Sequence, residues 1–282
     1  MNQFGTLYIV ATPLGHLQDM SWRAVEILQT VHLIAAEDTR HSLPLLQHYS
    51  IKTPTISLHA HNEAERIEQL QKRLQQGESI ALISDAGTPL ISDPGFLLVR
   101  KIREVGIKVV PIPGPCAAIS ALCVGGLPTD RFVFEGFLPQ RSALRQTRLA
   151  QLVLEERTLI FYEAPHRILV FLKELQTVFG QNRPAVIARE LTKIFETILT
   201  GTLLQLYEKV EEDKNQQRGE IVVLVAGKPK NNEEEITAEI TRILTILLAE
   251  CSLKQAVDIT AKLTAFKKNH IYEIALKMQK TV

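Results

Sequence analysis

The sequence SDAGTPLISDPG, at residues 84–95, directly follows the apolar run IALI at residues 80–83. A β-branched apolar run that ends abruptly in small, turn-forming residues predicts a buried parallel strand, then a tight loop and a helix. In such sheets the ligand binds outside the carboxyl ends of the strands. Gly87 and Gly95 allow the backbone to approach a ligand closely, and Asp85 offers a carboxylate to hydroxyl or amino groups. One such loop, taken alone, is equally consistent with a plain strand–helix connection.

Two more loops of the same kind favour a ligand site. The run TLYIVA at residues 6–11 leads into TPLGHL at residues 12–17, and IKVVPI at residues 107–112 leads into PGPCAA at residues 113–118. Each is an apolar strand, then a loop rich in proline and glycine, then a helical pattern. Three loops that end three strands of one sheet would lie at the same edge.

The first half of the chain alternates between strand and helix patterns, which is typical of an α/β unit with a mainly parallel sheet. The expected strands are residues 6–11, 32–36, 55–58, 79–84 and 107–112. Helices are expected at residues 21–30, 40–48, 63–76 and 95–105, with a further helix that stops near Gly125. These elements predict a first α/β domain over residues 1–126.

The second half predicts another α/β domain, over residues 127–227. Its expected strands are residues 132–138, 157–163, 184–190, 195–200 and 220–226, and its expected helices are residues 142–155, 165–179 and 202–210. Residues 227–235 are polar, with a proline and a run of charges, which predicts a linker. The remainder, residues 236–282, has a helical pattern throughout and predicts a small separate module.

Composition sets limits on function. The chain has 282 residues, 45% of them hydrophobic and 6% aromatic, with a formal net charge of +1. Such a balance gives no overall attraction to nucleic acid, so any RNA contact must come from local basic patches. Three cysteines without C-x-x-C spacing favour a reducing compartment. No basic leader and no apolar stretch of the ~18 residues needed to span a bilayer is present, so we expect a cytoplasmic protein without a membrane segment.

Further motifs accompany the three loops. They are AEDTR at residues 36–40, HAHNE at 59–63, EGFLP at 135–139, FYE at 161–163 followed by HR at 166–167, and ARELTK at 188–193. Together the motifs and loops resemble the tetrapyrrole methylase superfamily, and most closely its ribosomal RNA branch. The resemblance runs from about residue 5 to the C-terminus. It implies an α/β, two-domain tetrapyrrole-methylase-like (class III methyltransferase) fold with a small C-terminal all-helical module.

The resemblance implies the cofactor S-adenosyl-L-methionine, without a metal. An activated methyl group needs no covalent nucleophile, so the protein must hold the cofactor, align the acceptor and shield the site. The residues implied for cofactor binding come from the three loops and from the end of the strand at 157–163. They are Thr12, Pro13, Leu14, Gly15, Ser84, Asp85, Ala86, Gly87, Thr88, Pro113, Pro115, Ala117, Ala118, Tyr162, Glu163 and Ala164.

The acceptor side has several candidate residues. A ribose 2′-hydroxyl is a poor nucleophile at neutral pH, so a positioned carboxylate or imidazole would assist by removing its proton. The candidate catalytic residues are Asp38, Arg40, His61 and Glu63, with Asp93 as a further carboxylate. A helix N-cap is an equally good interpretation of Asp38. His59 and His61 would share one face of a strand end, but two histidines without a third ligand do not form a zinc site.

Basic residues offer a route to RNA. Arg141, Arg145 and Arg148 follow one another at helical spacing and would form a positive stripe, although a solvated surface is the usual meaning of such a stripe. Lys267 and Lys268 lie in a turn between two helical stretches, 252–264 and 269–280, which resembles a helix-turn-helix. Arg189 and Lys193 are further candidates for phosphate contacts, or else ion-pair partners of Glu190 and Glu196.

The resemblance implies methylation of a cytidine 2′-oxygen in the decoding region of 16S ribosomal RNA, on the 30S subunit, by a homodimer. Two alternatives stay open: a small-molecule methylase of the same fold that acts on a tetrapyrrole, and a ribosome-binding factor that has lost catalysis. The helical module and the basic stripe favour RNA over a tetrapyrrole. Binding of labelled cofactor would separate an enzyme from an inactive factor.

Overall fold

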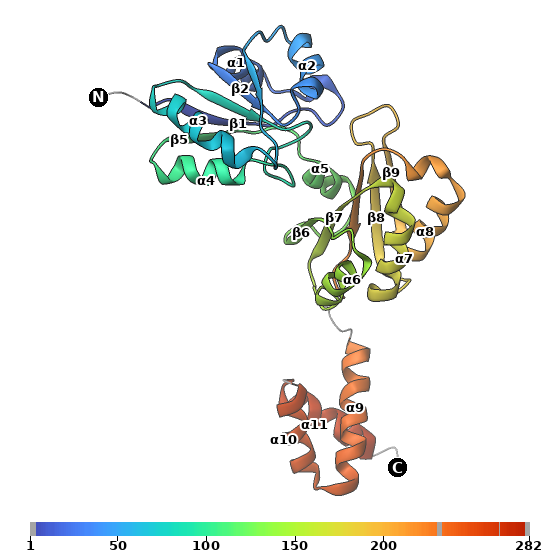
Figure 1. Cartoon of the computed structure of the whole chain (residues 1–282). Coiled ribbons are helices and arrows are strands. Elements are labelled where there is room, and N and C mark those ends of the chain that lie inside the picture. The colour runs from blue at the N-terminus through green and yellow to red at the C-terminus, as the bar shows by residue number, and fades with distance from the viewer. Residues whose placement is uncertain (1–3, 230–232, 265, 280–282) are drawn as a thin grey trace. The chain divides into compact units, whose positions relative to one another are not determined.

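A computed structural model gives the structure of the chain and describes residues 4–229, 233–264 and 266–279. The chain divides into two compact units, one up to Lys228 and one from Pro229 onward (Figure 1). The larger unit holds two five-stranded sheets with their helices, and the smaller holds three helices. No helix within the described ranges is long and apolar enough to cross a membrane.

The first sheet is wholly parallel, with the strand order β3-β2-β4-β1-β5. Its strands are β1 (Thr6–Val10), β2 (Leu33–Ala36), β3 (Thr55–Ser57), β4 (Ile80–Ile83) and β5 (Lys108–Ile112). The inner strands β2 and β4 are apolar and buried along their whole length because helices cover both faces of a parallel sheet. The three strands that end in the proline- and glycine-rich loops, β4, β1 and β5, are immediate neighbours.

Successive strand residues point to opposite faces and form two separate cores. On one face, Val10, Ile34 and Ile83 pack against α1 (Trp22–Thr30) and α2 (Thr39–His48). On the other face, the sheet residues pack against α3 and α4, as Figure 1 shows. Helix α3 spans Glu63–Gln75 and α4 spans Phe96–Glu104.

The second sheet is mixed, with the strand order β6-β7-β10-β8-β9. Its strands are β6 (Phe132–Phe137), β7 (Thr158–Glu163), β8 (Pro184–Arg189), β9 (Thr197–Thr202) and β10 (Ile221–Val225). Strand β10, the last in the chain, lies between β7 and β8 and is antiparallel to both. This insertion brings residues near 220 beside the end of β7.

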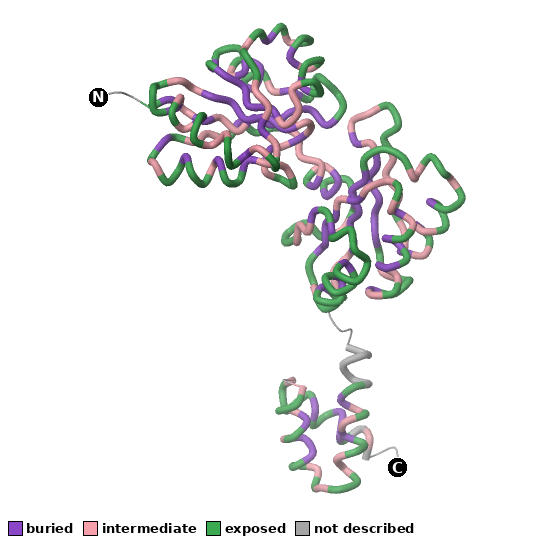
Figure 2. Tube along the Cα trace, in the orientation of Figure 1, coloured by how far each residue is buried: buried purple, intermediate pink, exposed green. Residues whose placement is uncertain are grey.

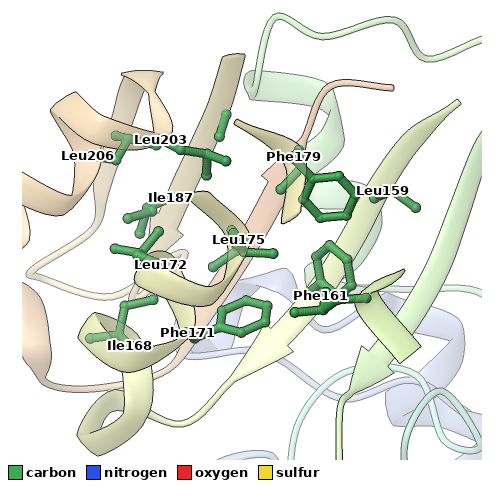
Figure 3. Packing of buried hydrophobic residues seen from close by; sticks show 14 of the residues in the cluster. Leu159, Phe161, Ile168, Phe171, Leu172, Leu175, Phe179, Ile187, Leu203 and Leu206 are labelled. Carbon is green, nitrogen blue, oxygen red and sulfur yellow. The ribbon is translucent and has the colours of Figure 1, made fainter. Parts of the chain in front are cut away.

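Helices also cover both faces of the second sheet. On one face lie α6 (Ser142–Gln151), α7 (Ile168–Phe179) and α8 (Leu203–Glu212), whose core includes the Phe161–Phe171 ring pair at 5.5 Å (Figure 3). Helix α5 (Ala117–Val124) covers the other face, where Ala121 packs on Ile160 and Val222. Buried residues accordingly run along the strands of both sheets (Figure 2). Helix α5 follows the first sheet in sequence, yet its apolar contacts are made with the second.

The smaller unit is a three-helix module with its own core. Its helices are α9 (Glu233–Glu250), α10 (Leu253–Thr264) and α11 (Lys268–Gln279). Ile240, Leu244, Val257 and Ile271 are buried among them. The expected helical stretches at 252–264 and 269–280 therefore match α10 and α11 closely, although residues 265 and 280–282 lie outside the described ranges.

Elsewhere the predicted elements agree with the structure to within a few residues at their ends, and α7, for example, begins at Ile168 after a short 3-10 helix at Pro165–Arg167. The helix expected at 142–155 ends at Gln151, and the strand expected at 195–200 is β9 at Thr197–Thr202. Part of the expected linker at 227–235 is helical, because α9 begins at Glu233.

Candidate active site

The three proline- and glycine-rich loops are bonded to one another at the carboxyl edge of the first sheet. Thr12 and Gly87 exchange two backbone hydrogen bonds, N–H to O, of 2.8 and 3.0 Å. The buried Thr12 hydroxyl also donates to the Ser84 carbonyl at 3.2 Å, and the Thr88 hydroxyl donates to the Pro115 carbonyl at 2.8 Å. Loops that follow β1, β4 and β5 thus form one rigid cradle.

The pairing of the first two loops requires an unusual backbone conformation at Gly87. Its φ of +82° lies in the left-handed region, where a residue without a Cβ is strongly favoured. A Cβ placed on it would lie 3.2 Å from Leu14 Cδ2, which is a tight contact. Glycine therefore lets the Thr12 and Gly87 backbones pair while leaving room beside Leu14.

A cavity of about 420 Å³ lies beside the cradle, within the size range typical of small-molecule sites. The first sheet and its loops contribute one set of lining residues: Leu14, Glu37, Asp85, Ala86, Gly87, Thr88, Ile91, Ser92 and Asp93. Helix α5, the second sheet and its loops contribute the other: Cys116, Ala117, Phe137, Tyr162, Glu163, Ala164, Pro165, Ala188, Leu191, Gly219, Glu220, Ile221 and Val222.

Most of the residues predicted for the cofactor are found at this cavity. Nine line it, namely Leu14, Asp85, Ala86, Gly87, Thr88, Ala117, Tyr162, Glu163 and Ala164. Others support the wall: Thr12 and Pro115 make the bonds between loops, and the Ser84 carbonyl accepts from Thr12. Pro13 and Gly15 line a neighbouring hollow instead. Pro113 and Ala118 are not among the lining residues, but the Ala118 amide bonds to the lining residue Tyr162.

Tyr162 ties the second sheet to the third loop. Its hydroxyl accepts a hydrogen bond of 3.1 Å from the backbone N–H of Ala118, in the first turn of α5. Its ring lies edge-on to Phe134 and Phe137, with centroids 5.1 and 5.5 Å away. Burial, together with nearby Cys116, raises the pKa of Tyr162 well above its ordinary value. Tyr162 therefore stays neutral at physiological pH and acts as a positioned hydroxyl.

Glu163 lines the cavity and is buried, with one carboxylate oxygen unpaired. Its side chain is only 1% exposed, and its Oε1 accepts from the Ala164 amide at 2.6 Å and from the Arg167 Nε at 2.8 Å. The Oε2 is buried without a hydrogen-bond partner among the residues that the structure describes. A buried, unpaired carboxylate oxygen is costly, so a bound donor is expected to satisfy it.

The carboxylates of Glu37, Asp85 and Asp93 gather at the end of the cavity nearest the first sheet. The Asp85 amide donates to Glu37 Oε2 at 3.4 Å, and the Asp38 amide donates to Asp85 Oδ1 at 3.1 Å. Burial raises the pKa of Asp93 to about 6, and the negative charges of Glu37 and Asp85 act in the same direction. Burial also raises the pKa of Glu37.

The residues predicted for catalysis follow β2 and β3, at the carboxyl edge of the first sheet, and their contacts differ from one residue to the next. Asp38 is the N-cap of α2 and accepts from the Arg40 amide at 2.8 Å, as its cap interpretation requires. Its side chain also pairs with that of Arg40, and this hydrogen bond lowers the pKa of Asp38 to about 2. The Arg40 side chain is 90% exposed. His61 is exposed in the turn before α3.

The prediction of a catalytic role for Glu63 is wrong. Glu63 is buried, and its Oε1 accepts from the Leu98 amide at 2.9 Å. Leu98 lies in the first turn of α4, whose N-cap is Gly95 and has no side chain to accept that bond. Glu63 therefore caps α4 from the neighbouring helix.

Replacing Glu63 with alanine is expected to lower the free energy of unfolding by about 1–2 kcal/mol, because the Leu98 amide would be left without its acceptor. Turnover per folded molecule should be unchanged. Urea denaturation and an activity assay check the two statements. Glu65→Ala, an exposed change on the same helix, is the matched control. Normal stability combined with lost turnover would restore the catalytic interpretation.

Two of the predicted RNA contacts are also wrong. Arg145 is 4% exposed, and its guanidinium pairs with the buried carboxylate of Glu174, so it does not share an exposed stripe with Arg141 and Arg148. Arg189 is 7% exposed and donates to the Phe195 carbonyl at 2.9 Å and to Gln216 at 3.1 Å. Both arginines are structural.

The other basic candidates remain at the surface. Arg141 is exposed, and Arg148 is partly exposed in a 2.8 Å pair with Glu135. Lys193 bridges Glu190 at 3.0 Å and Glu220 at 3.3 Å. In the smaller unit Lys267 is exposed and Lys268 pairs with Asp258 at 2.7 Å.

Sequence reasoning missed most of the second sheet's contribution to the cavity. Residues 219–222 line it only because β10 inserts beside β7, a strand order that no local pattern specifies. Ala188 and Leu191 come from the motif ARELTK, which pointed to a functional segment without defining these contacts. No group of three or more histidine, cysteine or acidic side chains suited to a metal ion is found within the described residues.

Comparison with known proteins defines the class of protein first. The family model described as Tetrapyrrole (Corrin/Porphyrin) Methylases matches residues 6–207. Among solved structures, a diphthine synthase has a TM-score of 0.61 at 14% identity, covering 79% of this chain and 90% of its own. A uroporphyrin-III C-methyltransferase from Thermus thermophilus, complexed with S-adenyl homocysteine, has a TM-score of 0.56 at 17% identity, covering 79% and 97%. The chain belongs to the tetrapyrrole methylase family.

Closer relatives narrow the assignment. The ribosomal RNA small subunit methyltransferase I of Pseudomonas aeruginosa is 56% identical over 98% of each chain, and that of Haemophilus influenzae is 54% identical over 96% of each. The model of the RsmI C-terminal HTH domain matches residues 234–279. Within the larger family, the chain therefore belongs to the ribosomal RNA small subunit methyltransferase I family. This confirms the predicted fold and enzyme class, an S-adenosylmethionine-dependent methyltransferase.

Proposed function

We propose that the protein transfers a methyl group from S-adenosylmethionine to the ribose 2′-oxygen of a cytidine in the decoding region of 16S ribosomal RNA, on the 30S subunit. The observation that carries this proposal is the cavity built jointly by the three bonded loops and the second sheet. Support for an RNA substrate comes from the relatives, which are named as ribosomal RNA methyltransferases. We further propose that the protein acts in the cytoplasm as a homodimer.

The cavity fits the proposed cofactor in three respects. Gly87 leaves space beside Leu14 that a Cβ would fill. The unpaired Oε2 of Glu163 is ready to accept a hydrogen bond from a ligand hydroxyl or amino group. The carboxylates of Glu37, Asp85 and Asp93 suit a ligand that carries positive charge at its sulfur and its amino group.

The division of the lining suggests which part of the cofactor each side holds. Leu14, Ala117 and Ala188 provide apolar contacts for the flat adenine ring. Glu163, at the wall of the second sheet, is placed to bind a hydroxyl or amino group. When bound, the cofactor supplies an already activated methyl group, so the protein's task is to hold, orient and exclude water.

We propose that the acceptor nucleotide approaches at a second hollow beside the cofactor cavity. It has a volume of about 540 Å³ and shares Leu14, Asp85, Ala86 and Glu220 with the cofactor cavity, and its other lining residues include Arg40, His41 and Lys193. Its basic side chains suit a ribose–phosphate backbone. We propose that Arg40, oriented by Asp38, contacts a phosphate beside the target ribose, and that His61 lies along the same edge.

The helical module is the proposed RNA-binding element. Lys254, Lys262 and Lys267 are exposed on α10 and on the turn after it. Phosphate contacts position a protein on nucleic acid and make binding depend on salt. Arg141 and Arg148 are proposed as weaker contacts from the larger unit.

Removing all residues after Lys228 is expected to leave cofactor binding intact, because every residue that lines the cavity remains and the smaller unit has a core of its own. Affinity for 30S particles should fall, and each lost phosphate contact should flatten the log–log salt dependence by roughly 0.7–0.9. Filter binding at several salt concentrations measures both. Unchanged affinity and slope would show that the helices only pack or dimerise.

The reaction itself is tested with purified protein, radiolabelled S-adenosylmethionine and three substrates: 30S particles, naked 16S ribosomal RNA and a tetrapyrrole. We expect label on 30S particles above all, recovered as 2′-O-methylcytidine after nuclease digestion. Methylation of a base or of the tetrapyrrole would contradict the proposal. Cofactor binding without any transfer would favour the inactive ribosome-binding factor.

A further inference from the structure

The charged side chains that line the cofactor cavity are all acidic. Within the described part of the chain they are Glu37, Asp85, Asp93, Glu163 and Glu220, with no lysine or arginine among them. Cofactor sites for anionic ligands normally present basic groups or helix N-termini. An all-carboxylate lining instead creates a negative potential inside a partly closed space.

Two of these five carboxylates form ion pairs with basic residues that do not line the cavity. Arg167 pairs with Glu163 through Oε1, and Lys193 pairs with Glu220 at 3.3 Å. Even so, the side chain of Glu163 is 99% buried and its Oε2 is left without a partner by the described residues. Because Glu163 is a lining residue, the wall of the cavity includes a buried carboxylate with one oxygen left unpaired by the described residues.

The remaining three, Glu37, Asp85 and Asp93, form what we call the carboxylate cluster. Backbone amides of Asp85 and Asp38 bond to the first two. Asp93 lies beside the hydroxyl of Ser84, and no backbone amide donates to it among the described residues. The other titratable groups near the cluster are Tyr162, which is neutral, Cys116 among the lining residues, and His41 and Asp38 beside Glu37.

The cluster therefore carries negative charge that no lysine or arginine pairs with among the described residues. Asp93 is half-buried and close to two other carboxylates, so its ionised form is disfavoured and its pKa is raised to about 6. A cation placed at this end of the cavity would relieve the repulsion among all three groups. A neutral ligand of the same shape would not.

We propose that the carboxylate cluster, with Asp93 as its principal member, selects the ligand by the charge on its sulfur, binding S-adenosylmethionine in preference to S-adenosylhomocysteine. The inference rests on the cofactor placement of the proposed function and adds a specificity determinant to it. The two ligands share the adenosine and amino-acid parts and differ in the methyl group and the positive charge. Any electrostatic preference between them therefore reports the environment of the sulfur.

This selection would favour turnover. When the methyl group leaves, the bonding electron pair stays on sulfur, which becomes a neutral thioether, and the acceptor hydroxyl loses its proton to solvent. The attraction between the sulfur and the carboxylate cluster is then lost. Product leaves more readily, and fresh cofactor replaces it.

The preference must depend on pH. Because the pKa of Asp93 is raised to about 6, its carboxylate is anionic above that pH and neutral below it. The preference for the charged ligand is therefore fully present near pH 8 and declines as the pH falls through about 6. Glu37, whose pKa is raised as well, adds to the decline in the same direction.

The test is isothermal titration calorimetry of the full-length protein with S-adenosylmethionine, S-adenosylhomocysteine and sinefungin, an analogue with an amine in place of the sulfonium, at pH 5.5 and pH 8. At pH 8 we expect both cationic ligands to bind about tenfold more tightly than S-adenosylhomocysteine, the effect of one charge at ~6 Å in a medium of effective dielectric constant ~40. The ratio should shrink several-fold at pH 5.5.

Asp93→Asn is isosteric and keeps an acceptor for Ser84, so thermal melting should show a normal fold. We expect it to reduce the ratio at pH 8 several-fold and to flatten its pH dependence. Asp130→Asn, the same change at an exposed carboxylate that does not line the cavity, should leave the ratio as in wild type. A wild-type ratio near one, or an unchanged ratio in Asp93→Asn, would overturn the inference alone. Failure of all three ligands to bind wild-type protein would overturn the cofactor placement and this inference with it.

Discussion

Replacing Gly87 with valine is expected to reduce the affinity for S-adenosylmethionine at least ~100-fold, because a β-branched residue is strongly disfavoured at positive φ. The φ of Gly87 is +82°, and the added Cβ would crowd Leu14 at 3.2 Å. Relief of that strain would break the paired hydrogen bonds with Thr12 and displace the cavity wall. Isothermal titration calorimetry with S-adenosylmethionine measures the loss.

The matched control is Gly180→Val. Gly180 ends α7 with a similar φ of +88°, and a Cβ placed there would meet nothing within 4 Å. Both variants therefore place a β-branched residue at positive φ, and both should lose stability of about 1–2 kcal/mol. Only Gly87→Val should lose the cofactor. Equal cofactor affinity in the two variants would exclude Gly87 from the site.

Replacing Arg145 with methionine is expected to lower the free energy of unfolding by about 3–5 kcal/mol, because a buried carboxylate loses its partner. Arg145 Nη2 lies 2.8 Å from Glu174 Oε1, and Nη1 donates to the carbonyls of Pro139 and Gln140 at 3.0 and 2.9 Å. Both partners of the ion pair are at most 10% exposed. Urea denaturation gives the change in stability.

Two further variants test the cause of this loss. Arg141→Met, an exposed change at the start of the same helix, should alter stability by no more than about 0.5 kcal/mol. Adding Glu174→Met to Arg145→Met should recover much of the loss, because the unpaired charge disappears. If Arg145→Met were fully stable but bound 30S particles weakly, the original prediction of an RNA contact would be correct.

The sequence predicts much of the cofactor cradle because its signal is local. Each loop follows a run of apolar residues long enough for one strand and contains the glycines or prolines that end it. The rule that ligands bind at the carboxyl ends of parallel strands then places the loops at one edge. That β4, β1 and β5 are immediate neighbours follows from the strand order, which no single loop reveals.

The errors share a physical cause, since a local motif does not say whether a polar side chain is buried or which distant group it bonds to. Arg145 was grouped with Arg141 and Arg148, yet it precedes Leu149 and Leu152 by four and seven residues and lies on their buried face. Glu63 lay in a motif of polar residues, and its partner is the amide of Leu98, 35 residues away. Arg189 is the last residue of β8. Its side chain donates to Phe195, in the loop before β9, and to Gln216, in the segment before β10.

The second sheet explains why the far wall of the cavity was not predicted. Strand β10 enters the sheet between two earlier strands, and its first residues then face the third loop across the cavity. Such contacts depend on antiparallel pairing over about sixty residues of intervening chain, from β7 at Thr158–Glu163 to β10 at Ile221–Val225. From this wall, only the end of β7, with Tyr162 and Glu163 followed by Ala164, was assigned to the cofactor from sequence.

If this chain methylates a ribose of small-subunit ribosomal RNA with the cofactor bound against Gly87, that methyl group must be absent when Gly87 is replaced by valine. The most direct measurement maps 2′-O-methylation of 16S ribosomal RNA, by resistance to alkaline cleavage, in a strain without the protein that is complemented with wild type, Gly87→Val or Gly180→Val. We predict one cytidine in the decoding region that is methylated with wild type and Gly180→Val and unmethylated with Gly87→Val or no protein. An identical pattern of ribose methylation in all four strains would contradict the claim.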